Sequence, residues 1–131
     1  MRNFLLFLCL LVQPAWAQDK PISPAEFEAL VMGRTLMYSS ASGEYGAEEY
    51  LEDRRVRWSY LDGECTDGRW FDADDQVCFV YDGIDVPQCW KFYLRNDKLM
   101  ARFENNPTSA ELYETRRRDQ PLFCYGPEIG V

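Results

Sequence analysis

Beyond Gly33, apolar and polar residues alternate along short stretches in which Tyr, Phe, Trp and Val are dense. Alternation with a period of two is typical of β-strands, because successive side chains point to opposite faces of a sheet. Clusters of Gly, Asn, Asp or Ser, which favour turns, separate these stretches. The pattern predicts strands near residues 34–39, 45–52, 55–61, 68–72, 76–81, 88–95, 98–104 and 111–117.

The predicted strands follow one another about every ten residues through short connections, which favours an antiparallel meander. Eight short strands form either a small up-and-down barrel or a sandwich of two packed sheets. We therefore expect a mainly β fold. Closure into a barrel has the advantage that it removes exposed strand edges.

A helical pattern precedes the strands. Ser23-Pro24-Ala25-Glu26 has the form of a capping box with proline at the first helical position. Phe27 and Leu30 supply apolar positions, and Gly33 is a stop signal. The sequence predicts one short N-terminal helix over residues 23–32.

The first 17 residues have the pattern of a secretory signal peptide. Arg2 precedes an unbroken apolar run from Phe4 to Val12, and Ala15-Trp16-Ala17 is a small-x-small cleavage site. The run is too short to cross a membrane as a helix, which needs about 20 residues. We expect cleavage after residue 17, which leaves residues 18–131 as a single periplasmic or secreted domain without a membrane anchor.

The charge of the chain argues against nucleic acid as a partner. The formal net charge is −8, and it becomes −9 once Arg2 is removed with the signal peptide. A surface of this sign repels phosphates and anionic membranes. Net acidity otherwise speaks to solubility and association rather than to a particular function.

The cysteines indicate structural disulfides rather than a metal or redox site. Four remain after cleavage, an even number in an oxidising compartment, and the sequence has no C-x-x-C and no histidine. Zinc sites with recognisable spacing usually need one or the other. We expect neither a metal nor a cofactor. Four cysteines allow three pairings, and the one favoured here joins Cys78 to Cys89 and Cys65 to Cys124.

The favoured pairing follows from a hairpin between 76–81 and 88–95. Directly opposed residues of an antiparallel pair lie within disulfide range. Placing Cys78 opposite Cys89 aligns Val77 with Trp90, and Cys65 with Cys124 would then tie the chain's tail to the start of the fourth strand. The side chains that share one face of the hairpin in this register are Val77, Phe79, Trp90, Phe92 and Leu94.

Alternation also identifies a candidate core. In 55–61, Val56, Trp58 and Tyr60 point to one side, which we expect to be buried. The predicted core aromatics are Trp58, Trp70, Phe79, Trp90 and Phe92, together with Tyr50. The alternative is that a few of these rings line the mouth of a barrel.

The framework Cys65, Gly68-x-Trp70, Cys78-Phe79, Tyr81 and Cys89-Trp90, preceded by Glu49-Tyr50 and Val56-x-Trp58, resembles a group of small exported bacterial proteins known as domains of unknown function. The resemblance covers residues 27–124. It implies a shared fold and transfers no catalytic residues. The architecture is also similar, more distantly, to periplasmic β-barrels such as lipocalin-like carriers and lysozyme inhibitors.

Acidic and hydroxyl clusters have simpler interpretations than catalysis. Asp72-Ala73-Asp74-Asp75 lacks the glycine and glutamate of a calcium loop, so we interpret it as a turn. Glu48 and Glu49 face opposite sides of a strand and cannot form a glycosidase pair with each other, so we expect them on the solvated surface. The serines in 39–42 have no histidine to activate them.

The one dense basic segment is Arg116-Arg117-Arg118, which Arg102 would reinforce if strands 98–104 and 111–117 pair. Arginines in such a group can bind a carboxylate or phosphate through paired hydrogen bonds. The simpler interpretation is that they balance acids on neighbouring strands.

These features favour a non-enzymatic protein of the cell envelope. Its disulfide-linked β-domain would present a surface or a cavity to a binding partner. The partner is an unidentified envelope protein or a small ligand, and we expect a monomer. The alternatives are a lipocalin-like carrier of a small apolar ligand and, from a different class, a hydrolase with a pair of acids.

Overall fold

The computed structural model describes residues 20–125, so the predicted signal peptide at 1–17 lies outside the described residues. The chain begins with helix α1 (Pro24–Val31) and continues into a series of strands, with a short 3-10 helix, η1 (Glu52–Arg54), between the second and third. The strands are β1 (Thr35–Ser40), β2 (Gly43–Tyr50), β3 (Arg55–Ser59), β4 (Thr66–Ala73), β5 (Gln76–Tyr81), β6 (Gln88–Arg95), β7 (Lys98–Phe103) and β8 (Leu112–Arg118).

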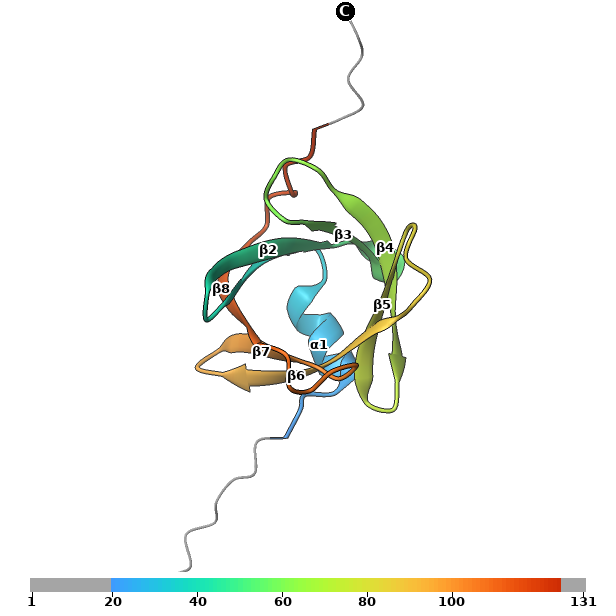
Figure 1. The fold of residues 1–131 in the computed structure, drawn as a ribbon, viewed down its shortest axis with the longest axis vertical. Coiled ribbons are helices and arrows are strands. Elements are labelled where there is room, and N and C mark those ends of the chain that lie inside the picture. The colour runs from blue at the N-terminus through green and yellow to red at the C-terminus, as the bar shows by residue number, and fades with distance from the viewer. Residues whose placement is uncertain (1–19, 126–131) are drawn as a thin grey trace, which may run out of the picture.

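The strands form a closed antiparallel barrel in which each strand pairs with its neighbours in sequence and β8 pairs with β1 (Figure 1). The predicted mainly β fold with one short helix is therefore confirmed, and of the two predicted architectures the barrel is the one observed. Each predicted strand lies within two residues of the observed bounds.

Two tight turns show why the strands end where they do. Asp74-Asp75 joins β4 to β5 and Asn96-Asp97 joins β6 to β7, and all four residues have positive φ between 50° and 63°. Two consecutive residues with left-handed backbone conformation are typical of two-residue hairpin turns, because the twist of such a turn matches that of the strands. The interpretation of 72–75 as a turn is confirmed at Asp74-Asp75, whereas Asp72 and Ala73 are the last residues of β4.

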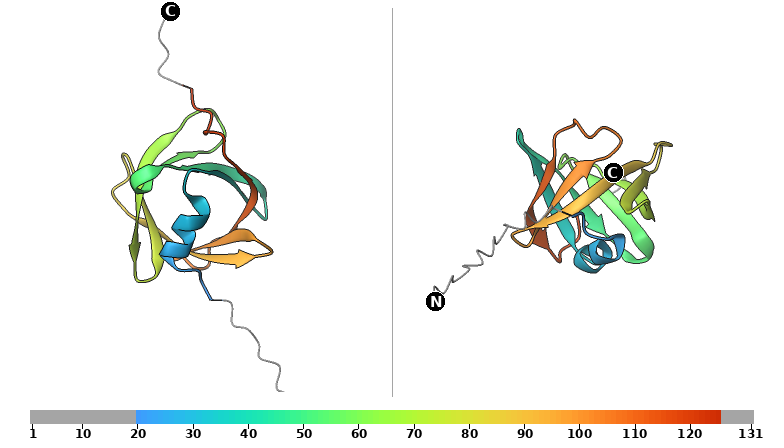
Figure 2. Two further views of the ribbon diagram at one scale, coloured as in Figure 1. Left: turned by 180° about the vertical axis from the view of Figure 1, so that it is seen from behind. Right: turned by 90° about the horizontal axis from the view of Figure 1, so that it is seen from below.

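Helix α1 lies across one end of the barrel, which we call the closed end (Figures 1 and 2). Ser23 Oγ accepts a hydrogen bond from the Glu26 amide at 3.1 Å, and Phe27 and Val31 on one face of the helix are fully buried. The Phe27 ring has its centroid 4.4 Å from that of Phe92 and 5.4 Å from that of Trp70. The helix therefore plugs the closed end with apolar side chains.

Arg54 fixes this helix to the barrel wall. Its Nη1 donates to Asp72 Oδ1 at 2.7 Å, and its Nη2 lies 3.4 Å from Glu28 Oε2 on α1. The guanidinium carbon is 4.2 Å from the centre of the Trp70 ring, a cation–π geometry. One side chain thus connects α1, the η1 segment and β4.

The opposite end carries four connections, at residues 41–42, 60–65, 82–87 and 104–111. No helix crosses this end within residues 20–125, and we call it the open end (Figure 2). The predicted core face continues along the inside of the barrel, where Tyr38, Tyr50, Val56, Trp70 and Phe92 are buried.

Both favoured disulfides are present. Cys78 lies opposite Cys89 in the β5–β6 register, with Val77 opposite Trp90, and Cys65 is bonded to Cys124 across 59 positions of the sequence. Two disulfides in one small domain indicate an oxidising environment outside the cytoplasm.

The segment that follows β8 has no regular secondary structure but is held by specific contacts as far as residue 125. Residues 119–125 pack on the outside of the barrel: Thr35 Oγ1 donates to the Gln120 carbonyl at 2.8 Å, and the Leu122 amide donates to Glu49 Oε2 at 2.9 Å. The Tyr125 amide then reaches the Gly63 carbonyl at 2.7 Å, beside the Cys65–Cys124 bond. We call residues 119–125 the strap.

Within residues 20–125, no helix has the length and apolar character required to cross a membrane.

Candidate functional site

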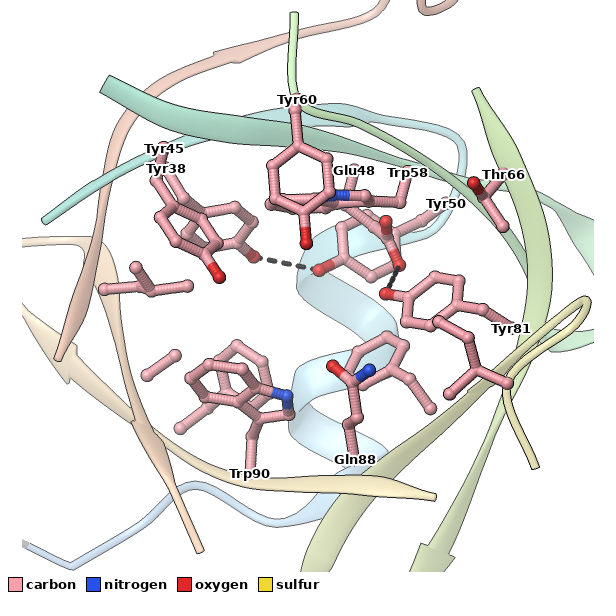
Figure 3. Close-up of a pocket in the computed structure, with 15 residues that line it drawn as sticks. Tyr38, Tyr45, Glu48, Tyr50, Trp58, Tyr60, Thr66, Tyr81, Gln88 and Trp90 are labelled. Atoms are coloured by element: carbon pink, nitrogen blue, oxygen red, sulfur yellow. Dashed lines mark hydrogen bonds between the residues drawn. The ribbon is translucent and has the colours of Figure 1, made fainter. Parts of the chain in front are cut away.

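A cavity of about 100 Å³ opens at the open end of the barrel and extends inward toward α1 (Figure 3). Its wall is mostly aromatic, and it draws on side chains from β1, β2, β3, β5 and β6 as well as on Ala101 and Leu112. The labelled side chains of Figure 3 converge on a common space from opposite sides of the barrel. Tyrosine is the commonest residue in this wall: Tyr38, Tyr45, Tyr50, Tyr60 and Tyr81.

The inner part of the cavity contains a small group of polar side chains. The hydroxyls of Tyr38 and Tyr50 lie 2.9 Å apart, and the Tyr81 hydroxyl donates to Glu48 Oε1 at 2.8 Å (Figure 3). Glu48 Oε2 is buried and has no hydrogen-bond partner. Buried polar atoms are nearly always satisfied in folded proteins, so this free oxygen is an exception that needs a cause.

Glu48 corrects our expectation of a solvated surface. The side chain is only 1% exposed, and Glu49 on the outer face is buried as well, beneath the strap. Alternation did place Glu48 on the same face as Tyr50, which we expected in the core, and this pattern was the signal available in the sequence. Our expectation followed instead the general preference of glutamate for solvent. The two acids do face opposite sides, as predicted.

Burial raises the pKa of the Glu48 carboxyl well above its ordinary value of 4.5, and the hydrogen bond from Tyr81 only partly opposes this effect. Burial likewise raises the phenol pKa values of Tyr50 and Tyr81, which the nearby carboxyl of Glu48 raises further. In the free protein the Glu48 carboxyl therefore favours its neutral form more than an exposed glutamate does. A neutral carboxylic acid presents both a donor and an acceptor to whatever enters the cavity.

Three rings form a cluster at the mouth of the cavity. Ring centroids of Tyr45, Trp58 and Tyr60 lie 5.4 to 5.8 Å from one another. A Cβ atom on Gly46 would lie 2.3 Å from the Trp58 ring, so only glycine lets the indole settle against β2. The burial predicted for Tyr60 is wrong: it is 63% exposed, because β3 ends at Ser59 and its side chain emerges at the mouth.

The predicted core aromatics divide into two groups. Trp58, Phe79, Trp90 and Phe92 line the cavity, whereas Trp70 packs below it against α1. The predicted alternative, that some of these rings line a barrel mouth, therefore holds for Trp58. Leu94 shares the face of Phe92 but is 44% exposed, since it is the last residue but one of β6.

The pairing of β7 with β8 does not bring Arg102 beside the arginines of residues 116–118. In the pairing of β7 with β8, Ala101 lies opposite Leu112, so Arg102 is near the open end of the barrel. The three arginines 116–118 lie at the other end of β8, near the closed end. Arg102 forms an ion pair with Glu104 at 2.8 Å. Arg117 binds Glu114 through two hydrogen bonds of 2.6 and 2.9 Å, and Arg118 Nε is buried without a partner.

The wall of the cavity contains few acidic or basic side chains among the described residues. Glu48 supplies its only carboxyl group among the described lining residues, so the second acid of a hydrolase pair is missing from its wall. Between residues 20 and 125, no three His, Cys, Asp or Glu side chains form a group that could hold a metal ion. What remains is an apolar, ring-lined space with a few converging polar atoms, the usual composition of a small-molecule site.

Comparison with family models, with curated proteins and with solved structures found no match to this chain.

Proposed function

We propose that this protein is an exported carrier that holds a small molecule in the open end of its barrel. The observation that carries the proposal is the cavity itself: it is lined by aromatic rings, plugged at one end by α1, and contains a buried carboxyl oxygen without a partner. A barrel of eight strands leaves room for one small ligand. Export to the periplasm or the medium is consistent with the two disulfides and with the N-terminal sequence pattern.

The size of the cavity limits the ligand. An engineered cavity of about 150 Å³ in another protein binds benzene, whereas drug-sized ligands occupy sites of about 300 Å³ or more. A space of about 100 Å³ therefore suits a molecule of a few heavy atoms, or one end of a longer molecule that projects from the mouth.

Native mass spectrometry of protein purified from its own host tests this proposal. We expect a retained small mass on the parent protein. Thr66 lines the mouth, so Thr66→Phe should block entry and abolish the retained mass. Thr115→Phe places the same ring at an exposed position of β8 outside the cavity wall and should leave the retained mass unchanged. Retention that is equal in both variants, or absent from the parent, would contradict the carrier function.

A second candidate function is attachment to a protein partner of the envelope. Large apolar side chains are exposed around the open end, among them Tyr60, Val86 and, on the strap, Phe123 and Tyr125 at 71% and 68% exposure. Exposed apolar patches of this kind mark interaction sites in soluble proteins. Cross-linking in the native periplasm followed by pull-down should recover a defined partner, and Phe123→Ser with Tyr125→Ser should lose it.

A further inference from the structure

The open end of the barrel is acidic. The loops at 60–65, 82–87 and 104–111 contain no Lys or Arg. One of their acids, Glu104, is neutralised by the ion pair with Arg102. A mouth lined by one sign of charge concentrates ligands of the opposite sign. The acidic residues of these loops are Asp62, Glu64, Asp82, Asp85, Glu104 and Glu111.

The ring-lined wall presents further sites for a cation. Tyr45, Trp58 and Tyr60 form the mouth, and Tyr50 and Tyr81 lie deeper beside Glu48. The faces of aromatic rings carry partial negative charge and attract ammonium groups within about 6 Å. Among the described residues that line the cavity there is no Lys or Arg that would compete for these rings or for the carboxyl group.

Glu48 provides the counter-ion. Its Oε1 already accepts a hydrogen bond from Tyr81, whereas Oε2 is buried and has no partner. The titratable groups that interact with it are the hydroxyls of Tyr38 from β1, Tyr50 from β2 and Tyr81 from β5, and none of these is a cation. Glu114 and Arg117 on β8 also interact with Tyr38, and they are hydrogen-bonded to each other. Burying an unpaired carboxylate is costly, so the free carboxyl favours its protonated form. A cation that enters beside it offsets this cost, so that the proton is released to solvent and the carboxylate becomes the counter-ion.

From these three features we infer that the cavity selects small organic ammonium ions, with the cationic nitrogen beside Glu48 Oε2 and its alkyl groups against the surrounding rings. The inference rests on the proposed carrier function, and it names the ligand class of that same site. The limited volume favours compact ions such as alkylated amines over long chains.

Isothermal titration with a charged and an uncharged probe of equal shape tests the ligand class. Choline is the cation, and its analogue with carbon in place of nitrogen, dimethylbutanol, is the neutral control. We expect choline to bind the parent protein on the order of tenfold more tightly than the analogue. In Glu48→Gln, which keeps the size and polarity of the side chain, the ratio should fall toward one.

Acidification provides an independent test that needs no variant. Protonation of Glu48 removes the counter-ion, so the affinity of the parent for choline should fall as the pH is lowered from about 8 to 5, while its affinity for the analogue should stay constant. Thr66→Phe should weaken both probes and Thr115→Phe neither, which shows that binding occurs in the cavity.

The outcomes separate this inference from the carrier function. Equal binding of the two probes, a ratio that Glu48→Gln leaves unchanged, or no binding of choline would overturn the ammonium class. If native mass spectrometry still shows a retained mass in any of these cases, the carrier function stands and its ligand is not an ammonium ion. If it shows none, both proposals are wrong.

Discussion

At the scale of single residues, Glu48 determines how the barrel interior responds to pH. Burial raises the pKa of Glu48 well above 4.5, so the folded state retains a proton that the unfolded chain releases. The stability that this group contributes is therefore fully present below pH 4.5 and is lost as the pH rises through the elevated pKa of the folded state. The buried carboxyl thus weakens the ligand-free fold at neutral pH.

We predict that Glu48→Gln is more stable than the parent at neutral pH and that this advantage shrinks on acidification. The amide cannot ionise, and one unit of pKa shift corresponds to about 1.4 kcal/mol. Denaturant unfolding of ligand-free protein at several values between about pH 4 and pH 8 measures the difference. A difference that does not change with pH would show that the pKa of Glu48 is the same in the folded and the unfolded chain.

Trp70 and Trp90 allow a comparison between a core ring and a cavity ring. Trp70 is buried between Phe27 and the Arg54 guanidinium, whereas Trp90 is half-buried, lines the cavity and packs on Phe103. We predict that Trp70→Ala costs about 3–5 kcal/mol and that Trp90→Ala costs less. Thermal and urea unfolding measure both. Equal costs would place Trp90 in the core rather than in the ligand site.

The sequence predicted the positions of these rings better than it predicted the acid between them. Alternation identified the inner face because a barrel wall repeats every two residues, and Trp58, Phe79 and Phe92 followed it. Alternation also placed Glu48 on the inner face, but it could not show the hydrogen bond that holds the carboxyl there, because Tyr81 is 33 positions away in sequence. Nor could it show the mouth: Tyr60 follows the alternation but lies beyond the end of β3.

At the scale of elements, the β5–β6 hairpin was predictable in detail because three local requirements agree. The disulfide, the burial of Phe79 opposite Gln88, and the pairing of Val77 with Trp90 all require one register. A shift by one residue would turn every side chain to the other face. The position of α1 was not predictable in the same way, because its capping box fixes where the helix begins and not which end of the barrel it covers.

We predict that replacing both Cys78 and Cys89 with alanine lowers the melting temperature without removing ligand binding. The bond spans 11 positions and should contribute roughly 2–3 kcal/mol by restricting the unfolded chain. Phe79 and Trp90 hold the same register without it. Calorimetry gives the stability, and titration with the retained ligand well below the melting temperature gives the binding. A variant of unchanged stability that no longer binds would show that the cysteines belong to the site.

For α1, we predict that Phe27→Ala costs about 3–5 kcal/mol, since its ring is fully buried against three others. Glu28→Gln is the matched control on the same helix: it weakens the contact with Arg54 but removes no apolar area. Urea unfolding of the two variants separates the packing of the helix from its ion pair. If both variants match the parent, the closed end does not depend on the plug.

At the scale of the whole molecule, the strap connects β1 and β2 to the start of β4 on the outside of the barrel. It leaves β8, crosses the outer face of β1 and β2 through Thr35 and Glu49, and ends at the Cys65–Cys124 bond before β4. The chain from Cys65 onward therefore forms a closed covalent loop that includes β4 to β8. The Cys65–Cys124 bond also anchors the end of the connection at 60–65, which carries Tyr60 at the mouth of the cavity.

We predict that alanine at both Cys65 and Cys124 destabilises the protein more than alanine at both Cys78 and Cys89. A loop of 59 positions restricts the unfolded chain more than a loop of 11, roughly 4 against 3 kcal/mol in the chain-entropy model. Opening the longer loop also frees the strap, whose Leu122 side chain is buried against the barrel. Urea unfolding of the two double variants side by side gives the order. The reverse order would mean that the strap stays folded on the barrel through its hydrogen bonds alone, so that the bond to Cys65 adds little.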